Sequence, residues 1–148
     1  MNGIGQRYFV VVLALALAAC GDARVDASDQ TVTAYNDAFN ARDVDAMLAM
    51  VHDDANWVSI RGTRATPMAG GLEALREALL EYFAANPTAR SRLISAERHG
   101  DFVQAFEEAS WERDGETKRQ CAASVYELRD GQIANVWYFD ARPCDGAN

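Results

Sequence analysis

The order of predicted helices and strands along the chain points to an α+β fold. Three segments with helical periodicity surround one strand-like stretch. Four further strand-like stretches follow, at about 91–98, 102–112, 117–128 and 132–140. Asp-Gly pairs separate the last three of them, and Asp-Gly between alternating apolar runs is typical of tight hairpins. The four stretches should therefore form an antiparallel meander, bent around the helices to enclose a cone with an apolar interior.

The three helical segments are marked by the spacing of their apolar residues and by their ends. The first begins at Asp29 and ends near Asn40-Ala41-Arg42. Asp43 fits the N-cap of a short second helix, because a carboxylate at that position accepts hydrogen bonds from free backbone N–H groups. The third helix carries an apolar stripe from Leu72 to Phe83 and stops before Asn86-Pro87.

One strand and one loop are predicted between the second and third helices. Asn56–Ile60 alternates as a strand does. His52-Asp53-Asp54 breaks the helical pattern, and we interpret it as a solvated turn rather than a metal cluster, because consecutive side chains at a helix end point in different directions. The segment 62–71 contains Pro67 and paired glycines and is predicted to be a loop.

Composition and motifs exclude several classes of function. The chain has 148 residues and a formal net charge of −8, without a run of Lys or Arg, which argues against nucleic acid as a partner. GxSxG, P-loop, GxGxxG and CxxC patterns are missing from the sequence, which argues against serine hydrolase, nucleotide and thioredoxin-type chemistry. His52 and His99 do not lie at ligand spacing from a cysteine, so neither a metal nor a cofactor is expected.

The N-terminal residues predict export from the cytoplasm. Arg7 precedes an apolar run over 8–17, which is too short for a permanent membrane span and typical of a secretory signal peptide. The small residues before Cys20 resemble a bacterial lipobox. This resemblance implies a signal peptide over residues 1–19, cleavage before Cys20, and acyl chains such as palmitate on that cysteine. An ordinary signal peptide cleaved nearby is the alternative.

A lipid on Cys20 would place the protein at a membrane surface. Several acyl chains make a stable anchor, since each buried methylene contributes about 0.8 kcal/mol. Residues 20–28 would form the anchor and its tether, with the rest of the chain facing the periplasm. Gly21, in place of an aspartate, favours the outer over the inner membrane.

The other two cysteines are candidates for a disulfide. Cys121 and Cys144 form an even pair in an oxidising compartment once Cys20 carries lipid. With Asp130-Gly131 as a hairpin turn, Cys121 lies opposite about residue 140, so a bridge requires the chain to turn near Pro143. Two separate thiols, one of them buried in a strand, are the alternative.

A family resemblance is carried by four stretches of the chain, residues 35–45, 53–55, 126–133 and 136–140. They resemble the NTF2-like superfamily, in particular its SnoaL-like polyketide cyclase and ketosteroid isomerase branches. The resemblance covers residues 29–141 and leaves 142–148 as a tail. It implies an NTF2-like cone, with three N-terminal helices packed on a strongly curved, mostly antiparallel sheet. Because this scaffold carries enzymes, binding proteins and assembly modules, it specifies the fold better than the function.

The catalytic carboxylates of the ketosteroid isomerase pattern are replaced in this chain. An ungapped alignment places Tyr35 on the tyrosine of the oxyanion hole, but it places Ser59 on the base and Ser124 on the protonated acid. A serine without a partner does not act as a base near neutral pH. That isomerisation is therefore disfavoured, and the resemblance leaves it open whether the protein is an enzyme, with a non-enzymatic role favoured.

Strand alternation predicts which residues line the cone. If Ser59 and Ser124 point inward, so do the side chains two residues away on their strands, and the same alignment turns three residues of the last strand inward. The predicted pocket comprises Tyr35, Trp57, Ser59, Arg61, Gln120, Ser124, Tyr126, Val136, Tyr138 and Asp140. An apolar pocket with a few polar groups is typical of a small-molecule site.

Asp140 is the one carboxylate expected near this cavity. Desolvation there would raise its pKa into the range of acid–base catalysis, with Tyr35 as the second candidate catalytic residue. The competing interpretation is an ion pair between Asp140 and Arg142 at the rim.

The same alternation places apolar residues on the outer face of the sheet. They are Ile133, Trp137 and Phe139, with Val125 as a further candidate. Exposed apolar area of this kind marks a partner surface, and NTF2-like relatives pair through that face, so we expect a homodimer.

The function predicted from these features is that of a lipoprotein that binds a small apolar molecule or serves as an accessory domain in the cell envelope. One alternative is a SnoaL-like cyclase, isomerase or hydrolase that uses Asp140 as its acid or base. The other is a protein–protein interaction module whose cavity is filled by its own side chains.

Overall fold

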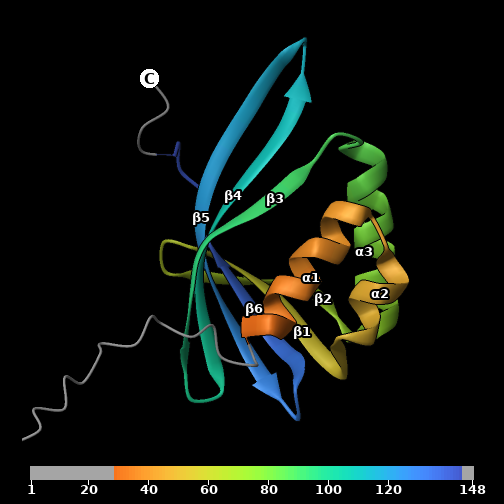
Figure 1. Ribbon diagram of the computed structural model, residues 1–148, viewed down its shortest axis with the longest axis vertical. Helices are drawn as coiled ribbons and strands as arrows, with labels where there is room; N and C mark the ends of the chain where they lie inside the picture. The colour runs from red at the N-terminus through yellow and green to blue at the C-terminus, as the bar shows by residue number, and fades with distance from the viewer. Residues whose placement is uncertain (1–28, 145–148) are drawn as a thin grey trace, which may run out of the picture.

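The computed structural model describes residues 29–144, which form three helices on one face of a strongly curved sheet (Figure 1). The helices are α1 (Asp29–Ala41), α2 (Val44–Ala49) and α3 (Gly71–Ala85). The strands are β1 (Val51–Arg61), β2 (Arg64–Gly70), β3 (Arg90–His99), β4 (Phe102–Arg113), β5 (Glu116–Arg129) and β6 (Gln132–Phe139). The predicted α+β fold class is confirmed. The predicted signal peptide, Cys20 and the tether lie outside the described residues.

The six strands form one sheet in the order β2-β1-β6-β5-β4-β3. Strands β3 to β6 make the predicted antiparallel meander, while β1 pairs parallel with β6 and antiparallel with β2. The parallel pairing sets Trp57 beside Val136 and Ser59 beside Tyr138. The middle of the chain and its C-terminal part therefore contribute to the same patch of the inner face.

Two predictions about the segment between α2 and α3 are wrong. The predicted loop over 62–71 contains β2, and the predicted turn at His52-Asp53-Asp54 is part of β1. Pro67 is tolerated because β2 is an edge strand, where a missing N–H costs no ladder hydrogen bond, and because a bulge interrupts the pairing there. Asp54 is held by an ion pair with Arg129, whose Nη1 lies 3.1 Å from Oδ2.

The short helix α2 is fixed at its start by the predicted cap. The side chain of Asp43 accepts a hydrogen bond from the backbone N–H of Ala46 at 2.9 Å. Val44, Met47 and Leu48 are buried, and they join the core that fills the space between the helices and the inner face of the sheet. None of the helices in the described part of the chain reaches the length and apolarity of a membrane span.

Ile133 lies in this core and not on the outer face, so that part of the predicted outer surface is wrong. It is fully buried, and its backbone N–H donates to the Met50 carbonyl at 2.9 Å. The cause is a bulge in the β5–β6 pairing: Leu128 pairs with Ile133, but Glu127 pairs with Asn135. The extra residue reverses the alternation along β6, which strict period-two counting cannot detect.

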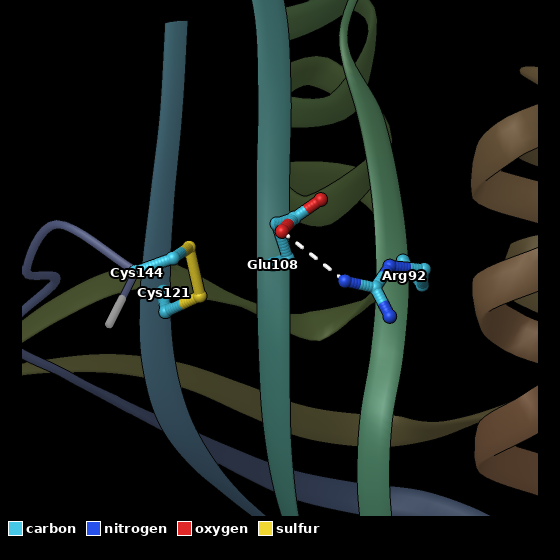
Figure 2. Close-up of a disulfide and its surroundings, with 4 residues drawn as sticks. All are labelled: Arg92, Glu108, Cys121 and Cys144. Atoms are coloured by element: carbon cyan, nitrogen blue, oxygen red, sulfur yellow. Dashed lines mark hydrogen bonds and ion pairs between the residues drawn. A yellow bond between two sulfur atoms is a disulfide. The ribbon is translucent and has the colours of Figure 1, made fainter. Parts of the chain in front are cut away.

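The C-terminal segment is attached to β5 by backbone hydrogen bonds and by a disulfide, which Figure 2 shows. Cys121 and Arg142 exchange two backbone hydrogen bonds of 2.7 and 2.8 Å. Arg142, rather than residue 140, lies opposite Cys121 because the register shifts along the hairpin. Cys144 then returns to Cys121, with 5.0 Å between their Cα atoms. A bridge of this kind contributes roughly 2–4 kcal/mol to stability.

Candidate functional site

A cavity of about 650 Å³ opens between the helices and the inner face of the sheet. Most of the residues predicted for the pocket line it: Tyr35, Trp57, Ser59, Arg61, Gln120, Tyr126, Tyr138 and Asp140. Ser124 and Val136 do not line it. Both are fully buried behind the cavity wall, so the prediction that they face a ligand is corrected.

Glu107 of β4 is a charged residue of the cavity wall that was not predicted from the sequence. It lies on the same face of the strand as the buried Val103 and Ala105, and it pairs with Ala122 of β5. Strand alternation from those small apolar residues could have found it. The resemblance to ketosteroid isomerase pointed to β1 and β5 instead, because Ser59 and Ser124 occupy the positions of its carboxylates.

The Glu107 carboxylate collects hydrogen bonds from two neighbouring hydroxyl groups. Its Oε1 accepts a hydrogen bond from the Tyr126 hydroxyl at 2.7 Å and a second one from Ser124 Oγ. The Tyr138 hydroxyl lies 3.4 Å from that of Tyr126. Residues from β4, β5 and β6 thus meet in one polar network at the wall of the cavity.

Burial keeps the tyrosine hydroxyls of this network protonated. Desolvation is the main cause that raises the pKa of Tyr35, Tyr126 and Tyr138 well above the ordinary value of a tyrosine. The negative charge of Glu107 raises each pKa further, and Tyr138 adds to the effect on Tyr35 and Tyr126. At neutral pH these side chains therefore act as neutral hydrogen-bonding groups.

Asp140 has a different environment from the one predicted. It is exposed at the mouth of the cavity, where its Oδ2 accepts a hydrogen bond from the Gly62 backbone N–H at 3.1 Å. No ion pair joins it to Arg142 within residues 29–144. The expectation that Asp140 is the one carboxylate near the cavity is wrong, because Glu107 also lines it and is less exposed.

Two polar atoms of the cavity wall have no hydrogen-bond partner among the described residues. Glu107 Oε2 accepts no hydrogen bond, and the Tyr35 hydroxyl makes none, within the described part of the chain. Tyr35 is nevertheless only 4% exposed. An acceptor and a hydroxyl group therefore share one aromatic-walled space, which suits the binding of a small molecule with a polar group or a proton transfer to it.

Three helices on a strongly curved sheet around an apolar cavity define the NTF2-like cone class of proteins. Within that class, the model of the SnoaL-like domain family matches residues 32–136. This is more than half of the chain, and the protein belongs to the SnoaL-like domain family.

Solved structures with the same fold come from several bacteria. A cystatin-fold protein from Novosphingobium aromaticivorans is 24% identical, with a TM-score of 0.67 over 76% of this chain and 97% of that one. IdmH from Streptomyces antibioticus, assigned as a polyketide cyclase, is 19% identical, with a TM-score of 0.65 over 78% of this chain and 91% of IdmH. A protein from Xanthomonas campestris with the same assignment is 23% identical, with a TM-score of 0.57 over 76% of this chain and 89% of that protein. These likenesses show the fold. No curated protein matches the chain.

Proposed function

We propose that this domain binds a small, mostly apolar molecule in the cavity, alone or as an accessory domain of an envelope assembly. The observation that carries the proposal is the cavity itself, about 650 Å³ in volume, with aromatic walls and few polar groups. Sites for small organic ligands share this size and composition. An interaction module with a cavity filled by its own side chains is not supported by this open space.

Native mass spectrometry of the full chain, purified in mild detergent without denaturation, should reveal a co-purifying small molecule. Ala122→Phe should reduce its occupancy at least about tenfold, because the ring would fill the space that Ala122 borders. Ala123→Phe is the matched control, since the neighbouring residue of β5 lies on the opposite face of the sheet. An empty native chain, or full occupancy in Ala122→Phe, would contradict the proposal.

Acid–base catalysis on the bound molecule is a second candidate function. One observation favours it: Glu107 Oε2 and the Tyr35 hydroxyl, both without a partner among the described residues, line the same cavity. Glu107 would act as the base and Tyr35 as a hydrogen-bond donor to the substrate, in place of the expected Asp140. A ligand released with deuterium taken from heavy water by the native chain, but not by Glu107→Gln, would favour this function over binding alone.

We further propose that the chain is anchored by acyl groups on Cys20 and faces the periplasm, with the outer membrane favoured by Gly21. The support is the sequence pattern of residues 1–21. Cys20→Ala should move the protein from the membrane fraction into the soluble periplasmic fraction, and the mass of the mature N-terminus should include the acyl chains. Native protein found only in the soluble fraction would contradict the anchor.

A homodimer formed through the outer face of the sheet is also proposed. Phe102 and Phe106 of β4 are 44% and 42% exposed, and the Phe102 ring lies beside that of Trp137 with 6.3 Å between the centroids. Exposed aromatic residues gathered on one face support a protein partner. The same native mass spectra measure the oligomeric state. A dimer mass is expected for the native chain and a monomer mass for Phe106→Glu.

A further inference from the structure

We infer that the cavity selects a ligand with a protonated amine on an apolar ring body, and that Glu107 Oε2 is its anchor. The inference rests on the proposed function, ligand binding in this cavity, and adds the chemical class of the ligand. It follows from where the protons of the network point, from the acceptor atoms that remain, and from the aromatic walls.

The protons of the network are directed at Glu107 and not at the ligand. A tyrosine hydroxyl carries one proton, and that of Tyr126 is donated to Glu107 Oε1, as is that of Ser124. In the 3.4 Å contact between the two tyrosine hydroxyls, Tyr138 must therefore be the donor. These three hydroxyls have no proton left for a carboxylate or another anion in the cavity.

Acceptor atoms, by contrast, remain free. Glu107 Oε2 receives no hydrogen bond within residues 29–144, although its carboxylate lines the cavity. Glu107 is half-buried, and a charged donor on the ligand would give Oε2 a charge-assisted hydrogen bond. The unpartnered hydroxyl of the buried Tyr35 has a proton to donate and also two lone pairs that can accept from the ligand. An ammonium group has three N–H donors and can bind Glu107 Oε2 together with other acceptors of the cavity wall.

The walls and the charges favour the same class of ligand. The rings of Tyr35 and Trp57 lie with 6.1 Å between their centroids, and Phe39 and Tyr82 also line the cavity. The faces of aromatic rings attract cations. The Asp and Glu side chains that line the cavity are Glu107 and Asp140, and the one Arg is the exposed Arg61. A carboxylate ligand would meet Glu107, whereas a protonated amine would form a charge-assisted hydrogen bond with it.

The test uses three probes with the same naphthalene ring and different charges. They are 1-naphthylmethylamine, which is a cation at neutral pH, the neutral 1-naphthalenemethanol, and 1-naphthaleneacetate, the anion of 1-naphthaleneacetic acid. Their dissociation constants are measured by calorimetry on the full chain in mild detergent at neutral pH. We expect the amine to bind about tenfold more tightly than the alcohol, as charge-assisted hydrogen bonds do, and the acetate to bind most weakly. This ranking is obtained on the native protein, so it does not depend on whether a variant folds.

Two variants then test whether the preference for the amine depends on the Glu107 carboxylate. Glu107→Gln should bring the amine to the affinity of the alcohol. Glu108→Gln should keep the preference, because Glu108 is the next residue of β4 and pairs with Arg92 at 3.2 Å on the other face, near the disulfide (Figure 2). This control removes the same charge from the same strand, so it separates binding in the cavity from attraction to an acidic surface.

Two sets of results are distinguishable. If the alcohol binds but the amine shows no advantage, or if the acetate binds most tightly, the amine inference is overturned while the binding function stands. A preference that persists in Glu107→Gln also overturns it. If no probe binds and native mass spectrometry finds an empty chain, the proposed function fails as well.

Discussion

The protein is expected to lose stability steeply as the pH rises above about 10. Tyr35, Tyr126 and Tyr138 have folded-state pKa values well above that of an unfolded tyrosine, which is about 10, chiefly because they are buried. Above pH 10 the unfolded chain releases protons that the folded chain retains. The stability present below pH 10 is therefore lost as the pH rises toward the folded-state values, by at most about 1.4 kcal/mol per pH unit for each tyrosine.

The alkaline prediction is checked by urea unfolding followed by circular dichroism at pH 8, 10 and 11. The sequence simplifies the experiment, because Lys118 is its single lysine and tyrosines dominate the titration in this range. Tyr35→Phe should change the stability little at pH 8, since no described residue hydrogen-bonds to the hydroxyl, and should make the protein more stable than the native chain at pH 11. Tyr82→Phe, which removes an exposed tyrosine, is the control with the smaller expected effect. An equal fall in stability for native protein and Tyr35→Phe between pH 10 and 11 would refute this account of Tyr35.

Replacement of Ile133 by alanine is expected to destabilise the protein by about 2–5 kcal/mol. Ile133 is fully buried in the core, and removal of its side chain leaves a cavity that the rigid surroundings cannot fill. The matched control is Ile94→Ala, because Ile94 is 43% exposed at an irregularity in β3 and should cost less than about 1 kcal/mol. Both values come from urea unfolding at neutral pH. Similar losses for the two variants would show that Ile133 does not have the buried position that the β6 bulge gives it.

The helices and hairpins of this protein could be predicted because their signals are local. Asp43 at a helix start and Asp130-Gly131 at a hairpin turn each act within a few residues, so a single segment carries the information. The order of such segments was sufficient for the α+β fold class. The pairing of Cys121 with Cys144 could be predicted for a simpler reason, since Cys20 was assigned to the lipid and two cysteines remained.

The candidate site depends on long-range register, which no local pattern reports. One inserted residue in the β5–β6 pairing moved Ile133 from the predicted outer face into the core. Pairing of β4 with β5 brought Glu107 next to Ala122 and within reach of Tyr126, where strand alternation gives the direction of a side chain but not its neighbours. The sequence was therefore enough to place most of the aromatic cavity wall. The hydrogen-bond partners of Glu107 were decided by the tertiary structure, because they lie on β5, and no local pattern in the sequence reports which residues of two strands are paired.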